Sequence, residues 1–229
     1  MHLNSFKIFH RLERLNEKFS GHGKIVGSGS GTIISPDGLL LTANHVVRRG
    51  ERIKVAIGSK VYSAEVVKRI ADLDVLLLKI QSTRTDFPFS ELMDCKKYPM
   101  GLPVFTVSYP NPEIQGYFPK LAKSYIAADK GARGNITQIQ ICCDAGSGSS
   151  GSAIFSTAGK VIGVLTTMLD PKIDADEYSE DVAFATKSGS FVKYLEDLLP
   201  LPMREEETES IRIIEGATKS SVLLLSCER

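Results

Sequence analysis

Four histidines could act as a catalytic base, and all lie in the first 45 residues: His2, His10, His22 and His45. His45 stands out because Leu39-Leu-Leu-Thr-Ala-Asn is typical of a strand that ends in a turn and presents the next residue. An ordinary turn histidine explains this pattern better if it is taken alone. Any nucleophile served by His45 must lie further along the chain.

The best candidate nucleophile lies in a glycine- and serine-rich segment, Gly146-Ser-Gly-Ser-Ser-Gly-Ser, between two apolar runs. Flexible linkers have the same composition, but a linker does not normally separate two strands by only a few residues. A tight glycine-rich loop can direct several backbone N–H groups at one point, as an oxyanion requires. Gly-x-Ser-Gly alone is a weak signal, so the prediction that Ser150 is the nucleophile depends on finding a base and an acid to accompany it.

Two acids, Asp72 and Asp74, precede the apolar run Val75-Leu-Leu-Leu-Lys-Ile. An aspartate at the mouth of such a strand is partly buried and needs a donor, which an imidazole N–H supplies. Together the candidates give His45, Asp74 and Ser150 in chain order, the order of the chymotrypsin-type triad. In the subtilisin order the aspartate precedes the histidine, and only Asp37 precedes His45. In the α/β-hydrolase order the histidine comes last, and no histidine follows Ser150.

The surrounding pattern predicts the elements that would position these residues. Short apolar runs with Gly and Pro turns fill residues 24–80, and a second set runs from 103 to 185, which favours an all-β fold. Residues 2–20 and 191–199 have helical spacing. We predict four segments: an N-terminal amphipathic helix (1–22), a first β-barrel (23–95), a second β-barrel with its closing C-terminal helix (96–200), and an acidic linker and tail (201–229).

Composition argues against several other classes of protein. The formal net charge is +1 and there is no Trp, so nothing suggests a nucleic-acid partner. No run reaches the roughly 18 apolar residues of a membrane span, and no metal-binding motif occurs, so we expect neither a membrane partner nor a metal or cofactor. The adjacent Cys142 and Cys143 are poorly placed for a mutual disulfide and are expected to be free thiols. Early charges exclude a secretory signal and predict a cytoplasmic location.

Several motifs make the chain resemble the protease domain of the HtrA/Deg branch of trypsin-like serine proteases. Residues 27–47, with Gly-Ser-Gly-Ser-Gly at their start and Thr-Ala-Asn-His around His45, are similar to the first barrel of that family. Asp74-Val-Leu-Leu-Leu-Lys-Ile is similar to the family's Asp-Leu-Ala-Val-Leu-Lys-Ile, which selects Asp74 over Asp72. Gly148-Ser-Ser-Gly-Ser-Ala resembles Gly-Asn-Ser-Gly-Gly-Pro, with Ser152 and Ala153 as departures. No segment of PDZ length follows, so PDZ-linked regulation is not expected.

The resemblance implies two packed antiparallel β-barrels, chymotrypsin-like, with the catalytic site between them. It implies that Ser150 attacks the scissile carbonyl, His45 acts as base and Asp74 orients His45, while the N–H groups of Gly148 and Ser150 form the oxyanion hole. By its distance before Ser150, Asp144 occupies the position that selects Lys or Arg in trypsin. Either Asp144 selects a basic side chain here, or the expected specificity pocket takes small or medium-sized apolar residues. Its walls are expected from four further residues: Leu165, Thr166, Phe184 and Ala185. The expected function is a serine endopeptidase acting on protein or peptide substrates.

Two alternatives remain open at this point. The chain can be a catalytically silent binding module that keeps the chymotrypsin fold, because a sequence does not show that the loop before Ser150 is formed. It can also be a self-processing, polyprotein-type protease domain, with the 201–229 tail as the segment to watch. The N-terminal helix either packs on its own domain or mediates self-association.

Overall fold

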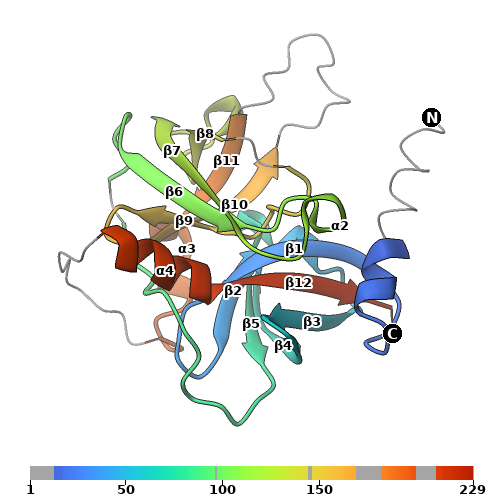
Figure 1. The fold of residues 1–229 in the computed structure, drawn as a ribbon. Helices are drawn as coiled ribbons and strands as arrows, with labels where there is room; N and C mark the ends of the chain where they lie inside the picture. Colours follow the sequence, from blue (N-terminus) through green and yellow to red (C-terminus); the bar gives the residue numbers. More distant parts are fainter. Residues whose placement is uncertain (1–12, 96, 144–145, 169–181, 200–209, 229) are drawn as a thin grey trace.

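Two closed antiparallel β-barrels of six strands each make up most of the computed structural model (Figure 1). The structure describes residues 13–95, 97–143, 146–168, 182–199 and 210–228. The predicted all-β, two-barrel architecture is confirmed. Within the described ranges, no helix is long and apolar enough to cross a membrane.

The first barrel carries His45 and Asp74 at one end of adjacent strands. Its strand order is β1-β12-β3-β4-β5-β2. The strands are β1 (Ile25–Ile33), β2 (Leu39–Ala43), β3 (Arg52–Ile57), β4 (Lys60–Ile70), β5 (Val75–Ile80) and β12 (Ser221–Cys227). The Ser35-Pro-Asp-Gly turn joins β1 to β2, and Gly38 adopts a φ of +91° that favours glycine. Apolar side chains, including Leu40, Leu76 and Leu224, fill the interior.

The last strand of the first barrel comes from the C-terminal segment, which corrects the predicted tail. Residues 210–227 form helix α4 (Ser210–Ser220) and strand β12, and β12 lies between β1 and β3 (Figure 1). All seven residues of β12 are buried. A strand buried on both faces has a continuous apolar run, here Val222-Leu-Leu-Leu, and its partners lie too far away in sequence for local patterns to reveal them.

The second barrel positions the segment that contains Ser150, and its strand order is β10-β11-β8-β7-β6-β9. The strands are β6 (Pro103–Ser108), β7 (Lys120–Ala128), β8 (Gln138–Cys142), β9 (Ala153–Ser156), β10 (Val161–Met168) and β11 (Val182–Lys187). Each corresponds to an apolar run expected as a strand. A separate apolar cluster, which includes Leu41, Leu77, Phe105 and Phe155, joins residues of the two barrels.

Short helices and turns make up most of the remaining regular structure. They are η1 (Asn44–Val46), η2 (Ala71–Leu73), α2 (Pro112–Gln115), η3 (Ala132–Gly134), α3 (Ser188–Phe191) and η4 (Val192–Tyr194). The single helix expected over 191–199 is instead α3, η4 and a following turn. Phe191 and Leu195 are still fully buried, so burial of this apolar face is retained without a continuous helix.

The described part of the N-terminal helix packs on its own domain. Residues 13–18 are helical, and Leu15 is fully buried in a cluster with Ile25, Tyr109 and Leu223. Residues 1–12 of the expected helix lie outside the described residues. The apolar contact of Leu15 is therefore satisfied within the chain, which does not favour self-association through this residue.

Candidate active site

His45 and Asp74 form a close two-point contact at the end of the first barrel. β2 and β5 are antiparallel neighbours with Ala43 opposite Val75, so the residues just beyond these strand ends meet. His45 Nδ1 lies 2.6 Å from Asp74 Oδ2, and the His45 backbone N–H donates to Asp74 Oδ1 at 2.9 Å. Because a carboxylate only accepts, Nδ1 donates in this contact, and in the neutral imidazole Nε2 is then the acceptor.

The backbone of Asp74 explains why this acid, rather than Asp72, reaches the imidazole. Asp74 follows the 3-10 turn η2 and has a φ of +52°, in the left-handed region that Asp and Asn tolerate better than most residues. Asp72 lies in η2 and is exposed. The left-handed residue lies just before β5, and it is the Asp74 side chain that makes both hydrogen bonds with His45.

The loop that carries His45 is held on both sides by residues from distant parts of the sequence. Arg69 Nη1 donates to Asn44 Oδ1 at 2.6 Å and to the Val47 carbonyl at 3.0 Å. Burial lowers the pKa of Arg69 from its usual value. On the other side, the Ser226 hydroxyl of β12 donates to the Val46 carbonyl at 2.7 Å. Sequence reasoning did not identify Arg69 or Ser226, and no local motif marks either one.

Ser150 lies in the turn between β8 and β9, anchored to both barrels. Its carbonyl accepts a 2.8 Å hydrogen bond from the Ser30 N–H of β1, and the next N–H, from Gly151, donates to Leu165 of β10 at 2.7 Å. Gly29 lies between the two candidate loops, because a Cβ there would be 2.6 Å from Val46 Cγ1 and 3.2 Å from the Ser150 carbonyl oxygen. The structure therefore brings Ser150 near the loop of His45 and Asp74.

Glycine is required beside Ser150 for steric reasons. Gly151 has a φ of +88°, and a Cβ on it would collide with Thr42 Oγ1 and with the carbonyl oxygen of Ser30. Gly148 has a φ of +100°, and a Cβ there would be 2.6 Å from the Tyr109 carbonyl oxygen. The segment is thus a tightly packed turn against β1 and β2 rather than a flexible linker.

Two backbone N–H groups of this turn, those of Gly148 and Ser150, donate no hydrogen bond to any residue that the structure describes. Likewise, neither the Ser150 hydroxyl nor His45 Nε2 has a hydrogen-bond partner within the described ranges. Catalytic hydrogen bonds are often long in the absence of substrate. The arrangement leaves a half-buried hydroxyl, an imidazole acceptor and two N–H donors uncommitted.

The residues expected to form a specificity pocket divide into three groups. Asp144 lies outside the described residues. Leu165 and Ala185 are opposite each other on β10 and β11, and both side chains pack in the core of the second barrel. Thr166 follows Leu165 at an irregularity in the pairing of β10 with β11, Phe184 precedes Ala185, and both Thr166 and Phe184 are buried. Thr166 and Phe184 therefore lie outside the core cluster that holds Leu165 and Ala185, although all four side chains are buried.

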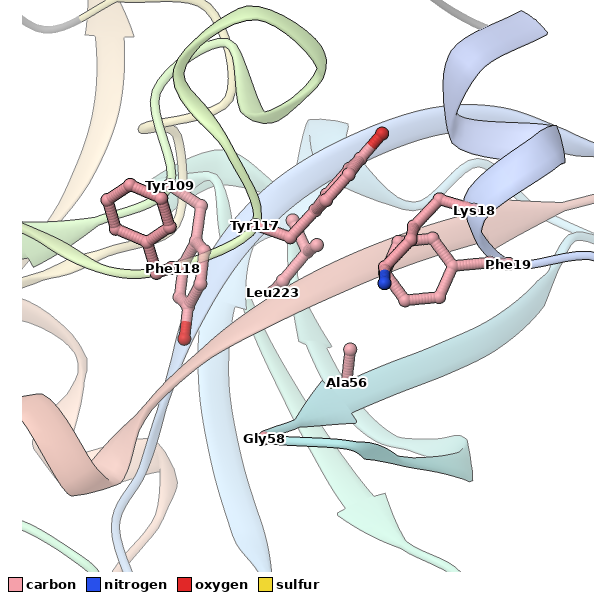
Figure 2. A pocket seen from close by; sticks show the side chains of 8 residues that line it. All are labelled: Lys18, Phe19, Ala56, Gly58, Tyr109, Tyr117, Phe118 and Leu223. Carbon is pink, nitrogen blue, oxygen red and sulfur yellow. The ribbon is translucent and has the colours of Figure 1, made fainter.

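A cavity of about 300 Å³ lies beside β12 (Figure 2). Tyr109 and Phe118 line one side and Lys18 and Phe19 the other, with Leu223 of β12 between them. None of the candidate catalytic or specificity residues lines it. Cys95, Cys142, Cys143 and Cys227 are free cysteines, and no cluster of metal-binding side chains occurs in the part of the chain that is described.

Comparison with known proteins gives a consistent result. A sequence model of the trypsin-like peptidase domain matches residues 29–164, more than half of the chain. The chain is 29% identical over 191 residues to the probable periplasmic serine endoprotease DegP-like of Brucella suis, covering 82% of this chain and 36% of that protein. It is 32% identical over 173 residues to the DegP-like protein of Rickettsia conorii, and the match covers 70% of this chain and 33% of that protein. It thus spans about a third of the length of these relatives.

Solved structures of similar proteins agree on the fold. The serine endoprotease from Yersinia pestis has a TM-score of 0.56 at 26% identity, covering 74% of this chain and 57% of that chain. The MamO protease domain from Magnetospirillum magneticum has a TM-score of 0.59 at 20% identity, and the match covers 77% of this chain and 90% of that chain. The expected resemblance to HtrA/Deg protease domains is confirmed.

The names of the relatives contradict the predicted cytoplasmic location. Those from Brucella, Rickettsia and Pseudomonas are named periplasmic endoproteases. The prediction rested on charges near the beginning of the sequence, which do not determine where this domain works. The cytoplasmic prediction is wrong.

Proposed function

The chain belongs to the trypsin-like peptidase domain family, and on that premise we propose that it is a serine endopeptidase acting on protein or peptide substrates. The observation that carries the proposal is the contact of His45 with Asp74 beside a glycine turn that contains Ser150. The names of the DegP-like relatives support both the activity and a periplasmic setting.

The proposed reaction begins at the Ser150 hydroxyl. As Ser150 Oγ attacks the scissile carbonyl carbon, its proton passes to His45 Nε2, the nitrogen left free by the contact with Asp74. The imidazolium then protonates the leaving amine, and the peptide bond breaks to leave an acyl group on Ser150. Water hydrolyses this ester by the same proton route, which releases a carboxylate and restores the hydroxyl.

The uncommitted N–H groups of Gly148 and Ser150 are the proposed oxyanion donors. During attack by Ser150 the scissile carbonyl oxygen becomes an oxyanion, and this oxygen would approach both N–H groups. Loss of one such donor typically lowers turnover about a hundredfold or more. Asp74 does not take up a proton in this scheme, and its contribution is to hold the imidazole and stabilise the imidazolium.

Substrate preference is proposed from the residues that the resemblance to trypsin-like proteases places at the specificity pocket. Thr166 and Phe184 offer a small polar and an apolar wall, whereas Asp144 would favour Lys or Arg before the cut if it lies at the base of the pocket. A digest of a peptide library separates these choices. No enrichment of Lys or Arg before the cleaved bond excludes the proposed role of Asp144.

Covalent labelling with a fluorophosphonate probe tests the proposed activity directly. The native protein should label on one serine, identified by mass spectrometry of the labelled peptide, and Ser150→Ala should not label. The matched control is Ser147→Ala, which removes an exposed hydroxyl from the same turn. Absence of labelling in a natively folded sample at both neutral and mildly alkaline pH excludes an active endopeptidase.

The unlabelled outcome would favour the second candidate function, a catalytically silent binding module. The observation that motivates it is the missing hydrogen bond between the Ser150 hydroxyl and His45 in the described part of the chain. Self-processing within β12 is less well supported, because every residue of β12 is buried in the first barrel and a protease needs an accessible, extended segment.

A further inference from the structure

Ser30 lies in β1 with no exposed surface and contacts three parts of the candidate site. Its hydroxyl donates to the Gly148 carbonyl at 2.8 Å and accepts from the Tyr109 N–H at 2.9 Å. Its own N–H donates to the Ser150 carbonyl at 2.8 Å. One residue of the first barrel therefore contacts the second-barrel turn both at Gly148 and at Ser150.

The carbonyl oxygens of residues 147–150 all accept hydrogen bonds from within the chain. The Ser147 carbonyl accepts from Asn111 N–H at 2.6 Å, and the Ser149 carbonyl accepts from Ser152 N–H at 3.1 Å. In a trans peptide the C=O and the following N–H point in opposite directions, and the described chain has no cis peptide. These two bonds therefore orient the N–H groups of Gly148 and Ser150 toward the open side of the turn.

The Ser30 hydroxyl holds the peptide that joins Gly148 to Ser149. Gly148 has no side chain to restrain it, and its φ of +100° is one of several values that glycine adopts at low cost. The Ser30 hydroxyl fixes its carbonyl, while the same oxygen holds Tyr109, which begins the 109–111 segment that orients Ser147. Removal of this hydroxyl would leave a buried donor and a buried acceptor without partners, which favours rearrangement of the turn.

We propose that Ser30 is a positioning residue for the nucleophile turn: its buried hydroxyl holds Gly148 and Tyr109 so that the N–H groups of Gly148 and Ser150 face a developing oxyanion. Ser30 touches no substrate in this arrangement and acts through the backbone of the turn. The role in turnover rests on the proposed endopeptidase function, whereas the role in ordering the turn does not.

The experiment compares Ser30→Ala with Ser90→Ala. Ser90 is a suitable control because its buried hydroxyl also makes a hydrogen bond, 2.9 Å to Ser220 Oγ, and is not bonded to the nucleophile turn. For S30A we expect the fluorophosphonate labelling rate and kcat to fall about 10- to 100-fold, the scale of a misplaced catalytic group, with KM changed less than about threefold. For S90A the labelling rate and kcat should both stay within about twofold of the native values.

A second measurement makes the test independent of activity. Hydrogen exchange of the amides in residues 146–152 should be faster in S30A than in the native protein, and unchanged in S90A. If S30A does not unfold cooperatively, S30C replaces it, since a thiol has nearly the same size but is a weak donor. Both measurements are made well below the unfolding transition of each variant.

The outcomes distinguish the two proposals. A native protein that does not label excludes the endopeptidase, and exchange at residues 146–152 then decides whether Ser30 orders the turn. Native-like labelling by S30A, or native-like exchange of the turn in S30A, overturns the role proposed for Ser30. An equal loss of kcat in S30A and S90A also overturns it, because a general loss of stability would then explain both variants.

Discussion

The Ser226 hydroxyl donates a 2.7 Å hydrogen bond to the carbonyl of Val46, the residue directly after His45. The two residues are 180 positions apart in the sequence. Ser226 belongs to β12, which pairs with β1 from Ile25↔Cys227 to Thr32↔Ser221 and also pairs with β3. The strand that closes the first barrel thus also supports the loop of the candidate base.

Truncation of the chain after Ser220 should abolish both folding of the first barrel and labelling of Ser150. Without β12, the facing edges of β1 and β3 lose their partners, and the barrel loses the fully buried Leu223, Leu224 and Leu225. The measurement is thermal unfolding together with fluorophosphonate labelling. A chain that ends at Cys227 is the control and should retain both properties. Cooperative unfolding with native labelling in the shorter chain would show that β12 is dispensable.

Asp74→Asn should lower kcat by about four orders of magnitude with little change in KM, the effect typical of this substitution in a catalytic triad. The amide can donate to Nδ1, which places the imidazole proton on Nε2 and removes the acceptor that Ser150 needs. Asn is the appropriate substitution because it tolerates the φ of +52° at this position. Steady-state kinetics on a peptide substrate measures the effect.

Asp72→Asn is the matched control for Asp74→Asn, because Asp72 lies two residues away and is exposed. It should retain native kcat and KM. A similar loss of kcat in both variants would contradict the assignment of Asp74 as the partner of His45.

Gly151→Ala should destabilise the protein by about 2–5 kcal/mol and eliminate labelling. The added Cβ would collide with Thr42 Oγ1 and the Ser30 carbonyl oxygen, and alanine would be strained at the φ of +88°. Gly58→Ala is the control, because Gly58 also has a positive φ, +58°, but a Cβ there meets nothing within 4 Å. Its cost should be about 1–2 kcal/mol, from backbone strain alone. Equal free energies of unfolding for the two variants would contradict the packing described around Ser150.

Stability should fall with increasing pH between about pH 10 and pH 12, in part through Tyr109. Burial raises the pKa of Tyr109 to about 12, whereas the unfolded chain has an ordinary value near 10. The folded state therefore holds this proton more tightly, so its contribution is complete below about pH 10 and is lost as the pH rises to about 12. The loss is on the order of 2 kcal/mol.

Denaturant unfolding of the native protein and Tyr109→Phe across this pH range measures that contribution. Burial also raises the pKa of Tyr98, so the native curve includes both groups, and the difference between the two proteins isolates Tyr109. The variant also loses the hydrogen bond from Tyr109 to the Ser221 carbonyl, which lowers stability at every pH. Parallel curves for the two proteins would show that Tyr109 does not titrate in this way.

Local patterns in the sequence predicted most strands and the candidate catalytic residues. Short apolar runs between turns correspond to strands such as β2, β5 and β9, since alternation, turn residues and run length are properties of neighbouring residues. The same patterns did not reveal the partners of β12 or the division of residues 188–199 between α3, η4 and a turn. Strand pairing and helix length there depend on packing against residues far away in the chain.

The sequence by itself determined which residue types stand next to each other: a histidine after a strand, an aspartate before one, and a serine among glycines. It also determined their order, which is that of the chymotrypsin-type triad, and the run that starts at Asp74 favoured Asp74 over Asp72 through a resemblance to known proteases. Only the tertiary structure decided that Asp74 reaches His45, that Leu165 and Ala185 face the barrel core, and that Ser30 and Ser226 support the two loops. The hydrogen bonds of Ser30 and Ser226 join residues more than a hundred positions apart and leave no local pattern, because they exist only once the chain has folded.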